Sequence, residues 1–211
     1  AAEWEKVAGK TGGDEPGARY YYAQARFAEA DRDYEAFLAA GLPSNLDFNR
    51  DDPATRARHL ARFDDWVVRS GRLADAATQR YRAALKVMDN ATSIAVAARL
   101  GQLAQHHADA LFTTEIPRSV RTGPFAEDKI EAFCDRMTEV ADPLEERAVA
   151  AYETCLEQSK RLGWYSDWSK LCERELGQIM PSKHPTASEL RAEPDQAAPI
   201  LAVEPPVRRL E

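Results

Sequence analysis

The sequence has few β-branched residues and no long apolar run. Isoleucine and valine together make up 15 of its 211 residues, against 37 alanines and 17 leucines. Alanine and leucine favour helix whereas β-branched residues favour strand, so an all-β fold is excluded. No run of about 18 apolar residues occurs, and residues 1–4 do not read as a secretion signal. We therefore expect an all-α protein with no membrane insertion.

Excess basic charge and phosphate-binding motifs are also lacking. The chain carries 28 Lys and Arg against 35 Asp and Glu, a net charge of −7, which argues against nucleic acid as a partner. Gly12-Gly13 is not followed by the pattern of a glycine-rich phosphate loop, and no serine or cysteine lies in a nucleophile elbow. We expect no enzymatic activity and no cofactor.

Cysteine and histidine spacings fit no metal site. Cys134, Cys155 and Cys172 are odd in number and lie 21 and 17 residues apart, which fits neither a zinc ligand set nor a disulfide framework. We expect them to be small, unpaired core residues. His106 and His107 are adjacent, so they point about 100° apart on a helix and cannot easily share one metal ion.

Composition divides the chain into three regions. Residues 1–17 are rich in glycine, which predicts a flexible segment. Residues 18–181 are expected to form a helical domain. Residues 182–211 form a proline-rich tail that is expected to be extended. Within it, residues 198–204 are suited to lie in the protein's own groove, which would make them autoinhibitory, or to add a strand to a partner; disorder is the alternative.

Glycine and proline divide the helical region further. No proline lies between Pro53 and Pro117, so that interval must be helical. Pro53 is expected to open a helix after an aspartate cap, and Gly71 is expected to break that helix. Pro143 is expected to open another helix after a second aspartate cap, and Gly163 is expected to end it. The expected helices span residues 19–26, 28–40, 53–70, 73–88, 92–112, 124–140, 143–162 and 165–180.

Small and aromatic residues recur at helical spacing. Phe27, Ala30, Tyr34 and Leu38 form one stripe at steps of three and four, which predicts one buried face. Small residues let antiparallel helices approach closely, and large ones fill the space between them. Similar positions are Ala18 and Tyr21; Ala77, Tyr81, Ala84 and Leu85; Leu100 and Gly101; Ala148, Tyr152, Cys155 and Leu156; and Trp168, Leu171 and Cys172. This order resembles the tetratricopeptide repeat (TPR), a helical hairpin of about 34 residues.

The distances between tyrosines fit such repeats with insertions. Tyr34 and Tyr81 lie 47 residues apart, and Tyr81 and Tyr152 lie 71 apart. However, Tyr81 and Tyr152 both lie in helices that match the second helix of a repeat. First and second helices alternate, so an odd number of helices should separate these two, whereas two are expected. Either residues 113–123 hide a short helix or the third hairpin is irregular. An unrelated helical bundle with the same stripes in its core is the alternative.

The C-terminal part carries a second resemblance. It consists of Leu162, Trp164, Trp168, Ser169, residues 171–176, Pro181, Pro185, residues 187–189, Arg191, Ala192 and Pro194. This pattern looks like the C-terminal segment of TPR proteins of bacterial gliding-motility and cell-envelope machinery. It implies an envelope-associated assembly factor in the periplasm. No signal or lipid-anchor cysteine is present in this sequence, so that location would depend on sequence outside it, and a cytoplasmic location stays open.

The TPR resemblance implies a partner-binding surface. In a TPR array the first helices line a concave face, and their non-core positions meet the ligand. Those positions are Arg19, Tyr22, Arg26, Arg62, Trp66, Arg69, Gln102, Gln105, His106 and Asp109. Arginines pair bidentately with carboxylates, which favours an acidic peptide segment, although the asparagines of the family's carboxylate clamp are absent. In the alternative, the arginines pair with nearby acids such as Asp64, Asp65 and Glu29.

The sequence thus predicts an all-α, TPR-like superhelix of helical hairpins with an extended tail. We expect a non-enzymatic protein–protein interaction scaffold that binds a protein or peptide segment in a concave groove, within a larger assembly. The alternative function is a structural, self-assembling helical subunit without a groove. The sequence leaves the oligomeric state open.

Overall fold

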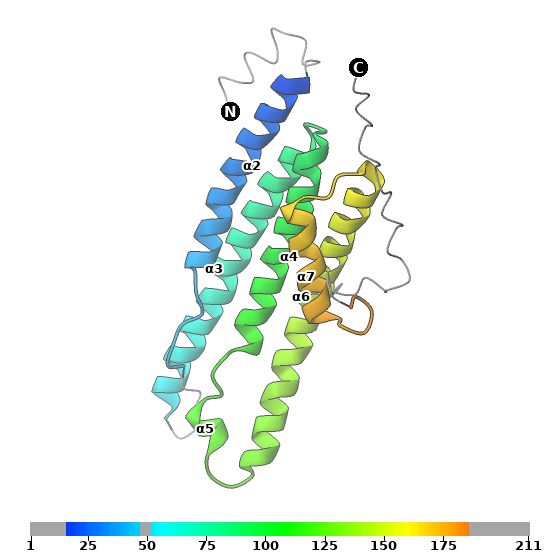
Figure 1. Ribbon diagram of the computed structural model, residues 1–211. Coiled ribbons are helices and arrows are strands. Elements are labelled where there is room, and N and C mark those ends of the chain that lie inside the picture. Colours follow the sequence, from blue (N-terminus) through cyan, green and yellow to red (C-terminus); the bar gives the residue numbers. More distant parts are fainter. Residues whose placement is uncertain (1–15, 47–51, 186–211) are drawn as a thin grey trace, which may run out of the picture.

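The computed structural model describes residues 16–46 and 52–185, whose regular structure is entirely helical (Figure 1). The helices are α2 (Pro16–Ala39), α3 (Pro53–Leu85), α4 (Asn90–Phe112), α5 (Arg118–Arg121), α6 (Ala126–Leu162) and α7 (Asp167–Ile179). The all-α prediction is confirmed for these residues, and none of their helices is long and apolar enough to cross a membrane. Pro16 and Gly17, expected in the flexible segment, begin α2 instead. The expectations for residues 1–15 and for the tail from residue 186 onward lie outside the described residues.

The long helices run alternately up and down, with α4 at the centre (Figure 1). α4 packs against α2, α3, α6 and α7, while α2 packs along α3 and α7 packs along α6. α5 lies in the connection from α4 to α6 at one end of the molecule (Figure 1). α4 therefore joins an α2–α3 pair to an α6–α7 pair.

Three expected helix breaks are wrong. α2 continues through Phe27, α3 through Gly71 and α6 through Pro143. A glycine inside a helix costs only about 1 kcal/mol relative to alanine, and a proline about 3 kcal/mol. Ala141 and Leu144, on either side of Pro143, pack in one apolar cluster with residues of α3 and α4. Burial on both sides of the proline offsets its cost, because tertiary packing supplies most helical stability.

These long helices replace the expected hairpins. α3 has 33 residues and α6 has 37, so each is about as long as a whole 34-residue repeat. Since a single helix spans most of residues 124–162, only α4 and α5 lie between the helices of Tyr81 and Tyr152. Residues 113–123 do contain a short helix, but two helices still separate those of Tyr81 and Tyr152, so the alternation of first and second helices is not restored.

Two helix ends lie where the sequence predicts them. Asp52 caps α3, since its carboxylate accepts a hydrogen bond from the backbone N–H of Thr55 at 3.0 Å, and Pro53 opens the helix. Gly163 ends α6 with a φ of 61°, a left-handed conformation that costs glycine nothing sterically. Both ends depend on local chemistry alone.

The alanine and tyrosine stripes form the core, as predicted. The fully buried members are Ala77, Tyr81 and Ala84 of α3 and Ala148, Tyr152 and Cys155 of α6. In α2, Phe37 is buried, whereas Leu38, expected in the stripe, is 37% exposed. Tyr21 and Leu85 are also exposed rather than buried. At Gly101 a Cβ atom would overlap the Tyr152 ring, so α4 and α6 pack here without a side chain between them.

The prediction of unpaired core cysteines is wrong. Cys155 and Cys172 are buried, but they form a disulfide that joins α6 to α7, with Cα atoms 6.5 Å apart. The turn at Gly163 reverses the chain and brings these residues side by side, which their spacing alone does not reveal. Cys134 is free but exposed, not buried.

Candidate functional site: a groove between α3 and α6

A groove of about 630 Å³ runs over α4 between α3 and α6. Among the described residues, no Cα atom of α3 lies within 8 Å of one in α6, so these helices form two separate walls. The groove is lined by Gly71, Ala74, Asp75, Thr78, Gln79 and Arg82 of α3, Leu100, Leu103, Ala104 and His107 of α4, and Leu144, Arg147 and Ala151 of α6.

The floor is apolar and the walls carry small side chains. Leu100 and Ala104 of α4 are half-buried and form the floor with Leu103, which belongs to the core. Ala74 of α3 and Ala151 of α6, also half-buried, line the groove from its two walls. Small wall residues leave space above the floor, and that space is suited to apolar side chains of another molecule.

The other side of α4 is closed by α2 and α7. The Arg99 side chain of α4 donates a hydrogen bond from Nε to Asp31 of α2 at 3.0 Å. Its guanidinium lies 5.0 Å from the Tyr34 ring and 4.9 Å from the Trp168 ring of α7. Phe27 of α2 contacts Trp168 directly, with ring centroids 5.7 Å apart. Rings and charge therefore fill this side.

Two buried tyrosines tie further helices together. The Tyr81 hydroxyl donates to Asp31 at 2.6 Å, and burial, followed by this hydrogen bond, raises the pKa of Tyr81. The Tyr152 hydroxyl donates to Gln105, and burial, followed by the charge of Glu175, raises the pKa of Tyr152. Both phenols stay neutral at physiological pH, and their hydrogen bonds join α3 to α2 and α6 to α4.

Trp66, predicted to meet a partner, belongs to the core. Its side chain is 3% exposed, and its indole N–H donates to the carbonyl oxygen of Ala40 at 2.8 Å. Arg62, one turn earlier, donates to the carbonyl oxygen of Ser44 at 3.2 Å rather than pairing with an acid. Arg69 is exposed on the same helix. The prediction for Trp66 is wrong because the end of α2 covers it.

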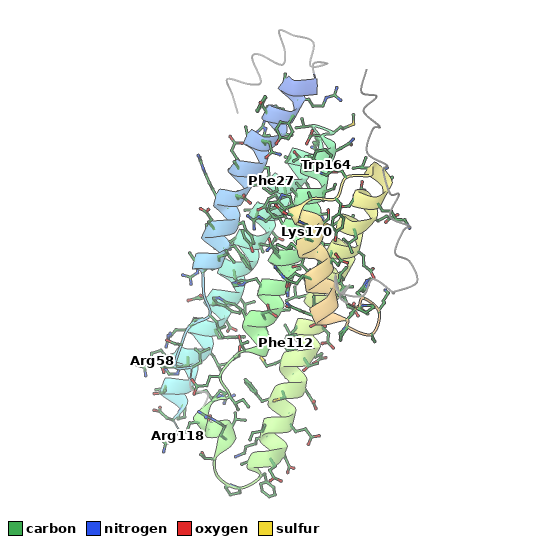
Figure 2. The ribbon with its side chains drawn as sticks, in the orientation of Figure 1. Phe27, Arg58, Phe112, Arg118, Trp164 and Lys170 are labelled. Carbon is green, nitrogen blue, oxygen red and sulfur yellow. A yellow bond between two sulfur atoms is a disulfide. The ribbon has the colours of Figure 1, made fainter. Side chains whose placement is uncertain are left out.

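The predicted arginines do not form one strip. Arg26 donates hydrogen bonds to the Tyr22 hydroxyl at 2.9 and 3.1 Å and pairs with Glu29 at 3.5 Å, which is the expected alternative. Figure 2 shows Phe27, its neighbour, on the upper half of α2, and Arg58, one turn before Arg62, at the opposite end of the molecule. Since α2 and α3 are antiparallel, Arg19, Tyr22 and Arg26 lie far from Arg62 and Arg69.

The predicted residues of α4 face α2 and α7. Gln102 accepts a hydrogen bond from Arg99 at 2.8 Å, and Gln105 donates to Glu175 of α7 at 3.2 Å. The His106 ring lies 5.8 Å from the Phe37 ring of α2, and Asp109 is exposed one turn further on. None of the ten predicted partner-binding residues lines the groove.

His107, which the sequence argues against as a metal ligand, lines the groove. It also borders a small cavity of about 20 Å³, and its ring lies 5.7 Å from Phe37 and 5.8 Å from Trp66. Burial, and after it the charge of His106, lowers the pKa of His107. The ring is therefore neutral at physiological pH and extends the apolar floor. Among the residues that the structure describes, no group of three or more His, Cys, Asp or Glu side chains could hold a metal ion.

The missed groove did have a signal in the sequence. Val96, Leu100, Leu103 and His107 follow one another at steps of four, three and four, which marks an apolar stripe on α4. Gly71, Ala74 and Thr78 are a matching stripe of small residues on α3. The sequence cannot show that this stripe has no third helix over it.

No family model matches this chain, and neither does a curated protein or a solved structure. The resemblances to TPR proteins and to gliding-motility proteins therefore depend on the sequence patterns alone. Fold and groove together define a class: an all-α protein with an accessible groove between two of its helices.

Proposed function

We propose that this protein is a non-enzymatic interaction module whose groove between α3 and α6 binds an α-helical segment of a partner protein. The observation that carries this proposal is the groove itself, with its apolar floor and its two walls whose Cα atoms stay more than 8 Å apart. A helix laid along the floor contacts α3, α4 and α6 at once.

Helix geometry favours a helix over an extended peptide. Packed helices lie 8–10 Å apart, and the gap between α3 and α6 follows α4 along at least two turns, from Leu100 to His107. An extended peptide gains affinity from main-chain hydrogen bonds to a strand edge, and helices α3, α4 and α6 offer none. An amphipathic helix satisfies its own backbone and gains affinity by burying apolar side chains.

A displayed library of 21-residue amphipathic helices tests this proposal. The library keeps one apolar stripe constant and varies its edge positions among Glu, Lys and Ala. Selected peptides are measured by fluorescence anisotropy against the wild-type protein, Ala151→Trp and Ala150→Trp. Ala151 lines the groove and Ala150, its neighbour, is exposed outside it, so these variants form a matched pair.

We expect Ala151→Trp to weaken binding at least tenfold and Ala150→Trp to change it less than twofold. Equal affinity for both variants would show that the peptides bind elsewhere. Light scattering across concentration checks the alternative of self-assembly. Oligomers that Ala151→Trp abolishes would mean that a second copy, rather than a partner protein, occupies the groove.

A further inference from the structure

Three charged residues at the rim of the groove have no partner within residues 16–46 and 52–185. Asp75 and Arg82 are exposed on the α3 wall, and Arg147 is exposed on the α6 wall. No ion pair or side-chain hydrogen bond joins any of them to another described residue. Asp75 and Arg147 line the same groove with opposite charges, yet they do not pair across it.

Two arginines of α3 and α4 that lie outside the groove pair with acids of α2. Arg80 of α3 lies 2.5 Å from Asp33 of α2, and Arg99 of α4 lies 3.0 Å from Asp31 of α2. Asp75, Arg82 and Arg147 have no such pairing with any described residue and line the groove, so they are available to a molecule that enters it.

We propose that the partner helix carries a fixed charge pattern: a basic residue beside Asp75, and acidic residues beside Arg82 and Arg147. This inference rests on the proposed function of the groove. Asp75 and Arg82 are seven residues apart, which is two helical turns or about 10 Å along α3. The edge of the partner that follows α3 therefore carries opposite charges two turns apart, and the edge that follows α6 carries an acid.

This pattern selects one orientation of the bound helix. Reversing the partner helix end to end, with its apolar stripe still on the floor, also exchanges its two edges. Its basic residue then lies on the α6 side, which carries Arg147, and Asp75 loses its opposite charge. Complementary rim charges chiefly accelerate association and reject wrong partners and registers, and they contribute less to affinity than buried contacts do. The apolar floor supplies affinity, and the three charges supply direction.

The edge positions of the peptides selected from the library test this inference. We expect enrichment of Lys at one position and Glu two turns away on one edge, with Glu on the other edge. Arg147→Glu should weaken the selected peptides three- to tenfold at 50 mM salt, and changing the facing Glu of the peptide to Lys should restore the loss. At 500 mM salt the difference should nearly disappear because exposed charges are screened.

Lys160→Glu is the matched control, since it makes the same charge change on α6 outside the groove. Binders that are sensitive to Ala151→Trp but show no charge enrichment, or respond equally to Arg147→Glu and Lys160→Glu, would overturn the charge pattern and leave the proposed function intact. If selection yields no binder that is sensitive to Ala151→Trp, the proposed function fails and the charge pattern fails with it.

Discussion

The same substitution at two helical glycines should change stability in opposite directions. Gly71 lies within α3 and Gly101 within α4, and neither has a positive φ. Replacing glycine by alanine inside a helix ordinarily stabilises a protein by about 1 kcal/mol, because alanine loses less backbone entropy on folding. Without tertiary contacts, both Gly71→Ala and Gly101→Ala would show this gain.

The surroundings of the two glycines differ. A Cβ atom at Gly71 meets nothing within 4 Å, so the full gain of about 1 kcal/mol is expected there. A Cβ atom at Gly101 overlaps three atoms of the Tyr152 ring, which is fully buried and held by its hydrogen bond to Gln105. Overpacking of this kind costs about 3 kcal/mol at the upper end of its usual range. Gly101→Ala should therefore destabilise the protein by about 2 kcal/mol.

Urea unfolding followed by circular dichroism measures both variants against the wild type. The two free energies of unfolding should differ by about 3 kcal/mol, with unchanged dependence on urea. In thermal unfolding, Gly71→Ala should raise the Tm by about 2–4 °C, and Gly101→Ala should lower it by roughly twice as much. Stabilisation by both variants would refute the close packing of α4 on α6 at Tyr152.

Three further predictions concern the long helix, the disulfide and the groove. Pro143→Ala restores a backbone donor inside α6 at an exposed position, so it should stabilise the protein by about 3 kcal/mol in urea unfolding, and a loss of stability would contradict a continuous α6. Reduction of the Cys155–Cys172 disulfide, which closes a loop of 17 residues, should cost about 3 kcal/mol, and reductant should have no effect on a variant in which both cysteines are alanine. Because burial lowers the pKa of His107 in the folded state, the stability it contributes is complete above about pH 6.5 and is lost as the pH falls. Between pH 7 and pH 5 the His107→Gln variant should lose less stability than the wild type, and parallel losses would show that His107 is not the group responsible.

The sequence could predict what depends on neighbouring residues. The cap at Asp52 and the left-handed end at Gly163 require only local chemistry, and both lie where they were predicted. The buried faces of Tyr81 and Tyr152 follow from helical periodicity in the same way.

Helix continuity and the groove could not be predicted from the sequence. Whether Gly71 or Pro143 ends a helix depends on packing to either side, and that packing comes from residues distant in the chain. In the groove, α3 and α6 leave the Leu100 and Leu103 stripe of α4 uncovered. The sequence cannot show this, because the stripe has the same residues whether or not another helix covers it. The sequence also places Trp66 on a partner surface, because it does not show that the end of α2, a distant segment, buries this side chain.

The central position of α4 gives the molecule two faces that differ in how the helices are joined. On one face, Arg99, Phe27 and Trp168 connect α2 to α7 across α4. On the other, no Cα atom of α3 lies within 8 Å of one of α6 along the described chain. The contacts on the first face therefore fix how the two helix pairs sit on α4, while the groove face leaves open space between the same two pairs.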